Sequence, residues 1–379
     1  MKKILISVHF GDSIAHVLRT RIIAKDLISK GYDVRICIPS KGIPYFKTYV
    51  DLNNLFITDQ YYSYAKFPYA QNNEENFLQH AQSEFAFYKE FKPDILVGDT
   101  GIISFSYDPK IPFAKILNRF YIELGGNFDS PYSQLEKSVI KNQVERMINS
   151  TRGKLGLSDE FKYEDFISNP VFVNGSSFFV EDIAFPYKFV GINMKLTSSP
   201  IINKKSKICL VILGTGFTDE RTHTASEILK FIENRFTKIY VSYGEKIKEI
   251  SLYHPQNAIF EKSFNKVPDN IGLLICHGGF GTIHLGIQMQ VPMIITPWQI
   301  EQFSNASRVE RLGWGVNIGK YDKKTFMGIN QKMDIDWEKF VFFLNNPDML
   351  VKTKYKSDNY SNKKEHSLLF NIEAWINSI

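Results

Sequence analysis

Cysteine is scarce in this sequence. Only three occur in 379 residues, Cys37, Cys209 and Cys276, and no two of them form a CxxC pair. An odd number without paired spacing excludes a disulfide framework and the common zinc-binding patterns. Each cysteine lies in or at the end of an apolar run, so we expect reduced core cysteines in a cytoplasmic protein.

Long apolar runs and concentrated positive charge are also missing. No stretch approaches the roughly 20 apolar residues that a spanning helix needs, and the first apolar run, 3–8, is too short for a signal peptide. The net charge of +6 is spread along the chain, and the one tight basic cluster (Lys204, Lys205 and Lys207) lies in a linker-like stretch. Without an arginine-rich arm or an RNA-binding aromatic signature, nucleic acid is disfavoured as a partner.

The first half of the chain alternates strand and helix patterns. The apolar run at 3–8 is followed by apolar residues at helical spacing between Leu18 and Ile28, a stop at Gly31, and a second strand at 33–39. This βαβ pattern predicts a parallel sheet with a crossover helix. Further strands of this sheet are expected at 92–99 and 111–117, followed by an irregular, aromatic-rich segment up to residue 190.

A change in composition at 197–207 (TSSPIINKKSK) indicates a linker, and the strand–helix rhythm restarts after it. The second half therefore predicts an open α/β sheet of its own. Its strands are expected at 207–214, 238–244, 257–264, 271–276 and 292–297, with helices at 223–236, at 283–290, after 297 and at 366–379. Open α/β sheets bind ligands at the carboxyl ends of their strands, so the residues just after each strand are the candidates for a site.

A glycine-rich turn follows the strand that ends at Cys276. It runs from His277 through Gly278, Gly279, Phe280 and Gly281 to Thr282, and a helix is expected to follow. Backbone N–H groups at a helix start lack partners within the helix, and the helix dipole adds partial positive charge there. Such a turn is suited to binding a phosphate, with His277 and Thr282 as side-chain donors. The alternative is a tight turn with an incidental histidine.

The continuation of this turn resembles the family-1-type glycosyltransferases of the GT-B fold, which include antibiotic, macrolide and plant UDP-sugar transferases. Order and spacing match over about forty residues, and weaker resemblance extends along most of the chain. The matching positions are His277–Thr282, Val291–Pro292, Pro297, Glu301–Gln302, Asn305–Ala306 and Gly313–Gly315.

The resemblance implies an α/β architecture with two Rossmann-like domains that face a central cleft. Residues 1–198 would form the acceptor-binding domain and residues 199–360 the nucleotide-sugar-binding domain. Residues 361–379 would form a C-terminal helix that packs back on the first domain.

The resemblance also implies roles for donor-binding residues. His277 and Thr282, with backbone N–H groups near Gly279 and Gly281, would hold the donor diphosphate. The sugar hydroxyls would bond to Glu301 and Gln302, although an acidic residue in the first turn of a solvated helix would look the same. Two further positions, Thr215 after the strand at 207–214 and Phe264 beside the base, would contact phosphate and base.

Two departures from the family pattern affect the nucleotide. Ser263 and Phe264 replace the usual Pro and Gln near the base. Leu285 stands eight residues after His277, where many UDP-sugar transferases carry a Glu that bonds the ribose hydroxyls. An aliphatic side chain cannot accept those bonds, so the donor is either a deoxythymidine-type nucleotide or one whose ribose is held differently.

Glycosyl transfer to a hydroxyl needs a base near the acceptor oxygen, and histidine suits this role. His16 lies at the catalytic position that the resemblance implies, although Ala15 and Arg19 replace the family's Gly and Pro. Asp99 ends the strand at 92–99, where the family places the aspartate partner. A helix-capping histidine and a strand-end turn residue are the alternatives, and His9 is another candidate base.

The implied reaction is direct displacement with inversion at the anomeric carbon. It needs no metal or other cofactor if the helix start, His277 and Thr282 stabilise the leaving diphosphate. The partners would be a nucleotide-diphosphate sugar and an apolar or aromatic small-molecule acceptor. Aromatic residues at 61–69 and 105–121 would either line the acceptor pocket or pack in the core.

Three other functions remain open from the sequence. A membrane-associated transferase acting on a lipid-linked acceptor would need a basic and apolar patch on the first domain. A nucleotide-sugar epimerase of the same fold is disfavoured by His16 and Asp99. A catalytically degenerate nucleotide-binding protein is kept open by Ala15, Ser263 and Leu285. Neither the identity of the acceptor nor the oligomeric state follows from the sequence.

Overall fold

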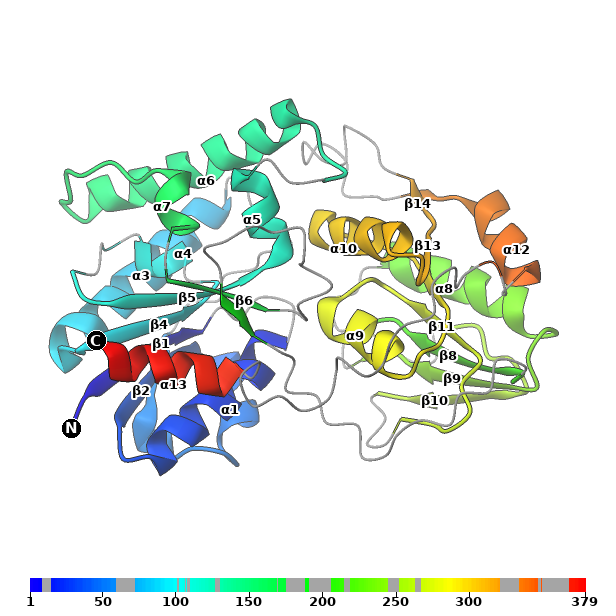
Figure 1. Ribbon diagram of the computed structural model, residues 1–379, viewed down its shortest axis with the longest axis horizontal. Coiled ribbons are helices and arrows are strands. Elements are labelled where there is room, and N and C mark those ends of the chain that lie inside the picture. Colours follow the sequence, from blue (N-terminus) through cyan, green and yellow to red (C-terminus); the bar gives the residue numbers. More distant parts are fainter. Residues whose placement is uncertain are drawn as a thin grey trace. The chain divides into compact units, whose positions relative to one another are not determined.

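The computed structural model divides the chain into two compact units, each built on its own sheet (Figure 1). Unit 1 comprises Met1–Asn193 with Asn362–Ile379, and unit 2 comprises Met194–Ser361. The boundaries expected at 198/199 and 360/361 lie outside the described residues. Described residues are 1–8, 15–58, 72–100, 102–105, 107, 110–126, 130–168, 170–174, 188–190, 206–214, 219–244, 252–262, 267–320, 334–346, 349 and 368–379.

Unit 1 contains a seven-stranded parallel sheet. In spatial order its strands are β3 (Leu55–Thr58), β2 (Asp33–Pro39), β1 (Lys3–Val8), β4 (Ile95–Asp99), β5 (Phe113–Asn118), β6 (Val171–Asn174) and β7 (Lys188–Val190). Its helices are α1 (Ala15–Ser29), α2 (Ile43–Phe46), α3 (Asn72–Phe91), α4 (Ile102–Phe105), α5 (Arg119–Gly125), α6 (Gln134–Lys154), α7 (Tyr163–Phe166) and α13 (Leu368–Ser378).

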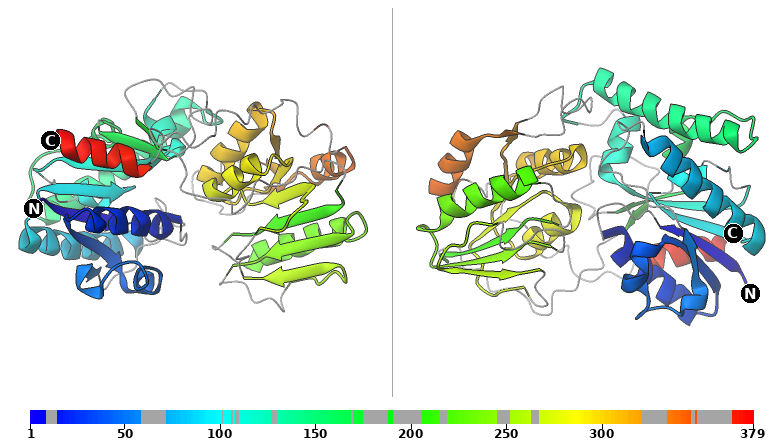
Figure 2. Two further views of the ribbon diagram at one scale, coloured as in Figure 1. Left: turned by 60° about the horizontal axis from the view of Figure 1, so that its bottom comes forward. Right: turned by 180° about the vertical axis from the view of Figure 1, so that it is seen from behind.

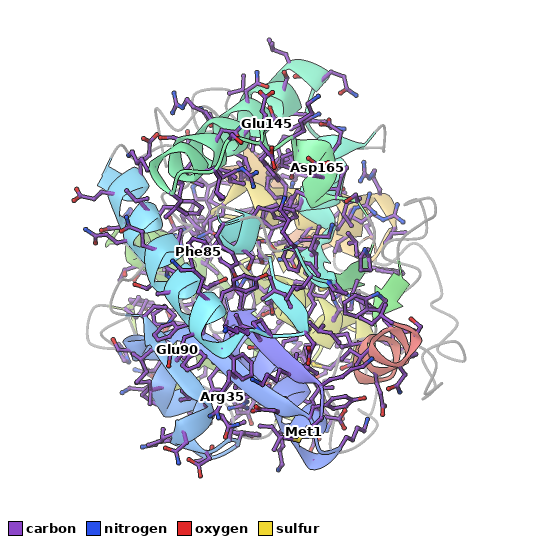
Figure 3. All side chains as sticks on the ribbon, turned by 90° about the vertical axis from the view of Figure 1, so that its left-hand side faces the viewer. Met1, Arg35, Phe85, Glu90, Glu145 and Asp165 are labelled. Carbon is purple, nitrogen blue, oxygen red and sulfur yellow. The ribbon has the colours of Figure 1, made fainter. Side chains whose placement is uncertain are left out.

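Successive side chains of each strand in unit 1 point to opposite faces of the sheet, because side chains alternate with a period of two residues along a strand. In β1, Ile4, Ile6 and Val8 pack in the core under α1 and α13, whereas Leu5 packs with the aromatic side chains of α3. Figure 3 shows the α3 side, with Phe85 and Glu90 on α3 and Glu145 on α6. Because both faces are covered, the strands are continuous apolar runs, which is why the sequence revealed them.

A buried carboxylate joins α3 to the segment after β4. Glu84 is fully buried and accepts hydrogen bonds from Ser7 (2.7 Å), Ser104 (2.9 Å) and Tyr107 (2.7 Å). Burial raises the pKa of Glu84, and the three hydroxyl donors oppose that rise. Of the aromatic residues at 105–121, Tyr107, Phe120 and Tyr121 are buried and Phe105 and Phe113 are half-buried. Those at 61–69 lie outside the described residues.

The C-terminal helix α13 packs on unit 1, as expected (Figures 1 and 2). Ile372 and Ile376 are fully buried in the core beneath α1. The rings of Trp375 and Phe172 pack edge to face, with their centroids 6.1 Å apart. The Lys2 Nζ donates to the carbonyl oxygen of Ile376 at 2.9 Å. The strand β1 and the helix α13 therefore belong to the same core of unit 1.

Unit 2 contains a six-stranded parallel sheet. In spatial order its strands are β10 (Ala258–Glu261), β9 (Lys238–Ser242), β8 (Ile208–Ile212), β11 (Leu273–Cys276), β12 (Met293–Ile295) and β13 (Gly315–Asn317). Its helices are α8 (Asp219–Ile232), α9 (Phe280–Gln288), α10 (Ile300–Arg311) and α12 (Trp337–Asn345), and β14 (Gly319–Lys320) pairs with β15 (Asp334–Ile335).

Close packing of α9 on the sheet of unit 2 depends on a glycine. A Cβ on Gly286 would lie 2.5 Å from the Met293 sulfur and 2.9 Å from a methyl carbon of Leu274. On the opposite face α8 and α12 cover Val211, Val241 and their neighbours. Both faces are thus covered, and the carboxyl edge of the sheet is left for the connecting loops.

Two expectations about secondary structure were wrong. The segment up to residue 190, expected to be irregular, contains α6 and the strands β6 and β7. Ser133 and Glu136 form a capping box at the start of α6, and this signal was present in the sequence. Helix α9 begins at Phe280 rather than Ile283, because Gly279 is its N-cap and Phe280 is anchored in the core.

Docking of α13 predicts a large effect of one core substitution. Ile376→Ala should lower the free energy of unfolding of unit 1 by about 2–5 kcal/mol, because it removes buried methyl groups and leaves a cavity. Urea denaturation followed by Trp375 fluorescence would measure this. Glu373→Ala, which removes an exposed ion pair with Lys30, is the control and should cost at most about 1 kcal/mol. Equal effects of the two substitutions would contradict the docking described here.

Candidate active site

The carboxyl edge of the sheet in unit 1 brings His16 and Asp99 together. Strands β1 and β4 pair in parallel with Val8 opposite Asp99, so α1, which follows β1, starts beside the end of β4. His16 Nδ1 lies 2.8 Å from Asp99 Oδ1. Asp99 is fully buried, and the His16 side chain is 13% exposed. The pair expected from the sequence is therefore in contact.

This contact defines the tautomer of His16. A carboxylate oxygen only accepts, so Nδ1 carries the hydrogen, and in the neutral ring Nε2 carries the lone pair. Burial by itself would raise the pKa of Asp99, but the charges and hydrogen bonds of Arg19 and His16 outweigh it and hold that pKa below its ordinary value. Asp99 is therefore an anion that orients His16 and places the lone pair of the neutral ring on Nε2.

Arg19 is a third member of this cluster that the sequence analysis missed. Its guanidinium donates two hydrogen bonds to Asp99, from Nε to Oδ2 at 2.8 Å and from Nη2 to Oδ1 at 2.5 Å. Nη2 also lies 3.2 Å from His16 Nδ1. The sequence contained a signal: Arg19 stands three residues after His16, on the same face of a helix.

Backbone strain follows directly after Asp99. Thr100 is buried and has φ +68, a left-handed conformation that a β-branched residue rarely adopts. Its N–H donates to the carbonyl oxygen of Ile116 at 2.8 Å, and its hydroxyl lies 3.5 Å from His16 Nδ1. Strained residues of this kind occur where surrounding structure enforces them, often at functional sites.

In unit 2, His277 follows β11 and lies against two glycines. A Cβ on Gly214 would lie 2.9 Å from the imidazole, and a Cβ on Gly279 would lie 2.2 Å from its Nε2. Gly214 also has φ +87, which favours glycine. The two glycines are therefore required for the imidazole to occupy this position at the carboxyl edge of the sheet.

The protonation state of His277 differs from that of a histidine that donates a hydrogen bond to a phosphate. Nδ1 lies 3.3 Å from the carbonyl oxygen of Ile212, and a hydrogen bond there places the hydrogen on Nδ1 and a lone pair on Nε2. Burial, together with the positive charge of Arg221, lowers the pKa of His277 to about 4. At neutral pH this ring is uncharged, and its Nε2 accepts rather than donates.

The start of α9 carries the other phosphate-binding candidates. Gly279 is the N-cap, Gly281 and Thr282 lie in the first turn, and the Thr282 side chain is half-buried. Asn305 is buried in α10 and donates to the carbonyl oxygen of Gly278 at 3.2 Å. That bond fixes the turn before α9, and it gives a structural reason for the Asn-Ala pair of the motif.

Glu301 and Gln302 both lie in the first turn of α10 and are half-buried. Gln302 Oε1 accepts the backbone N–H of Trp298 at 2.9 Å, which ties α10 to the loop after β12. Leu285 is 6% exposed and packs inside the unit, so it offers no polar group to a ribose. Thr215, Ser263, Phe264 and His9 lie outside the described residues.

The described residues include neither a metal-binding cluster nor a membrane-spanning helix. In the part of the chain that the structure describes, no group of three or more His, Cys, Asp or Glu side chains could hold a metal ion. None of the described helices is both long and apolar enough to cross a membrane. The cysteines Cys37, Cys209 and Cys276 are buried and unbridged, as expected.

Comparison with known proteins agrees with the family resemblance. Residues 208–332 match the model of the glycosyltransferase family 28 C-terminal domain. The NDP-glycosyltransferase YjiC of Bacillus subtilis (strain 168) is 25% identical over 246 residues, which are 62% of this chain and 62% of YjiC. The similar stretch therefore spans less than two thirds of that relative.

Solved structures are similar over the full length. The calicheamicin glycosyltransferase CalG4 has a TM-score of 0.64 at 15% identity, covering 100% of this chain and 99% of its own. Arabidopsis thaliana UGT89C1 complexed with UDP has a TM-score of 0.61 at 13% identity, and the match covers 99% of each chain. The spinosyn rhamnosyltransferase SpnG complexed with thymidine diphosphate has a TM-score of 0.57 at 10% identity, and the match covers 100% of each chain. The GT-B fold and the resemblance to family-1-type glycosyltransferases are confirmed.

A buried histidine of unit 2, His284, predicts a loss of stability in acid. Burial lowers the pKa of His284 to about 3, and His284 is fully buried against Phe280. An unfolded histidine takes up a proton below about pH 6.5, which the folded ring cannot do until far lower pH, so unfolding is favoured as pH falls. Between pH 7 and 5, His284 should account for about 2 kcal/mol of lost stability.

The control is His284→Leu, whose stability should depend less steeply on pH even if it is lower at pH 7. Urea denaturation followed by tryptophan fluorescence at pH 7, 6 and 5 would measure both chains. If the variant and the native chain lost the same stability over this range, His284 would not be the neutral buried group described here.

Proposed function

We propose that this chain is an inverting glycosyltransferase. It moves a sugar from a UDP- or dTDP-sugar to a hydroxyl of a small, apolar or aromatic acceptor. The observation that carries the proposal is the His16–Asp99 contact of 2.8 Å at the carboxyl edge of unit 1, in a chain whose unit 2 matches a glycosyltransferase domain. CalG4 and SpnG are named for calicheamicin and spinosyn, which supports a small-molecule acceptor.

His16 acts as the general base in this proposal. Nε2 takes the proton of the acceptor hydroxyl as its oxygen attacks the anomeric carbon, and the bond from that carbon to the diphosphate oxygen breaks with its electron pair. The nucleoside diphosphate leaves, and the configuration inverts. Asp99 stabilises the imidazolium through Nδ1, and Arg19 keeps the carboxylate ionised and fixed.

The nucleotide is held on unit 2. The start of α9, with Gly279, Gly281 and Thr282, faces the phosphates with backbone and hydroxyl donors, and Glu301 and Gln302 bind the sugar hydroxyls. The donors at the start of α9 bind the leaving diphosphate without a metal.

Nucleotide binding tests the function directly. Isothermal titration in the presence of EDTA should show binding of UDP and dTDP, with dTDP bound at least as tightly, because Leu285 offers no acceptor to a ribose 2′-hydroxyl. Adenosine diphosphate is the control and should bind more weakly. Absence of binding by both pyrimidine diphosphates would overturn the proposed function, and clearly tighter UDP binding would overturn the deoxythymidine preference.

Removal of the base separates binding from chemistry. His16→Ala should lower transfer from a UDP- or dTDP-sugar to a phenolic probe such as 4-methylumbelliferone by about 10²–10⁴-fold, because the acceptor proton then has no positioned base. The dissociation constant of the nucleotide should stay within about twofold, since His16 lies in the other unit. Substitution of the exposed Lys89 by Ala is the control. Turnover retained in His16→Ala would refute the assignment.

A further inference from the structure

The phosphate site described above lacks a full positive charge among the residues that the motif supplies. The terminal phosphate of a nucleoside diphosphate carries about −1.5 to −2 at neutral pH, whereas a helix start offers about +0.5. His277 is uncharged at neutral pH, and its Nδ1 hydrogen is directed to Ile212. Thr282 and the glycines contribute only neutral donors.

Arg221 brings a cation to this edge. It lies in the first turn of α8, which follows β8, and β8 is the neighbour of β11 in the sheet. Its positive charge contributes to the lowered pKa of His277. Its guanidinium carbon lies 5.6 Å from the centre of the Trp298 indole ring.

Trp298 gives this guanidinium a fixed support. It follows β12, the next strand beyond β11, and its backbone N–H is bound to the Gln302 side chain at 2.9 Å. Arg221, His277 and Trp298 therefore lie in the segments that follow three adjacent strands, β8, β11 and β12. An arginine held near an aromatic ring keeps its planar set of donors oriented, and that set matches two phosphate oxygens.

We infer that Arg221 is a donor-binding residue whose guanidinium, supported by Trp298, binds the diphosphate of the sugar nucleotide beside the start of α9. The inference rests on the proposed function and deepens it. It assigns the main countercharge of the leaving group to α8, outside the glycine-rich motif. His277 then serves to space and shape the site between its two glycines, and the charge comes from Arg221.

The test compares a nucleotide with its nucleoside. Isothermal titration of the full chain would use UDP with uridine and dTDP with thymidine, on the native protein, Arg221→Met and Arg221→Lys. Arg221→Met keeps an unbranched side chain against Trp298 but removes the charge. The matched control is Arg235→Met, because Arg235 is exposed beyond the other end of α8 and contacts only the Phe231 carbonyl and Asn345 among the described residues.

Arg221→Met should weaken diphosphate binding tenfold or more and leave nucleoside binding within twofold. Arg221→Lys should lie between Arg221→Met and the native chain, because a lysine keeps the charge without the planar fork. Affinity of the native chain for the diphosphate should fall with added salt more steeply than in Arg221→Met. Arg235→Met should match the native protein throughout. Thermal melting would establish that each variant is folded.

Diphosphate affinity within twofold of native in Arg221→Met would overturn the inference and leave the proposed function standing. Equal losses for nucleoside and diphosphate would also overturn it, since they would show a general disturbance of the site. If Arg221→Met does not fold, native-like affinity and salt dependence in Arg221→Lys would overturn the bidentate contact. A native chain that binds neither diphosphate would instead refute the proposed function itself.

Discussion

Parallel strand pairing in register is the constraint on which both candidate sites depend. In unit 1 the pairing places Val8 opposite Asp99, so α1 begins where β4 ends. In unit 2, Ile212, Cys276 and Ile295 are aligned across three neighbouring strands, so their loops leave from one edge. A slip of one residue would turn Asp99 to the opposite face of the sheet, away from His16.

The two sites solve opposite electrostatic problems. Unit 1 buries a carboxylate and must keep it charged, which Arg19 and His16 do by direct bonds to Asp99. Unit 2 partly buries His277 and keeps it neutral, because desolvation and the charge of Arg221 both disfavour the imidazolium. A histidine in one unit is thus set up to accept a proton, and a histidine in the other is set up to remain uncharged.

Much of this architecture follows from the sequence, and the failures have physical reasons. The buried strands were visible because parallel strands covered on both faces are apolar throughout. Helix α6 was not, because only part of its surface is buried and its apolar residues are diluted by charge. His16 and Asp99 could be paired from the family resemblance and from their places after two strands. For Arg19 the only signal was its spacing from His16, because its bonds to Asp99 depend on a three-dimensional contact. Nothing in a sequence specifies which nitrogen of His277 carries hydrogen.

The bidentate ion pair between Arg19 and Asp99 makes substitution at one position depend on the residue at the other. With both present, the cluster is neutral while the histidine is unprotonated. Loss of the carboxylate alone would leave a guanidinium beside the imidazole and convert an orienting anion into a repelling cation. Loss of the arginine alone would leave a buried acid with one partner. The constraint is therefore one-sided: the family pattern pairs an aspartate at this place with proline at position 19, whereas Arg19 without Asp99 would face the imidazole as an uncompensated charge.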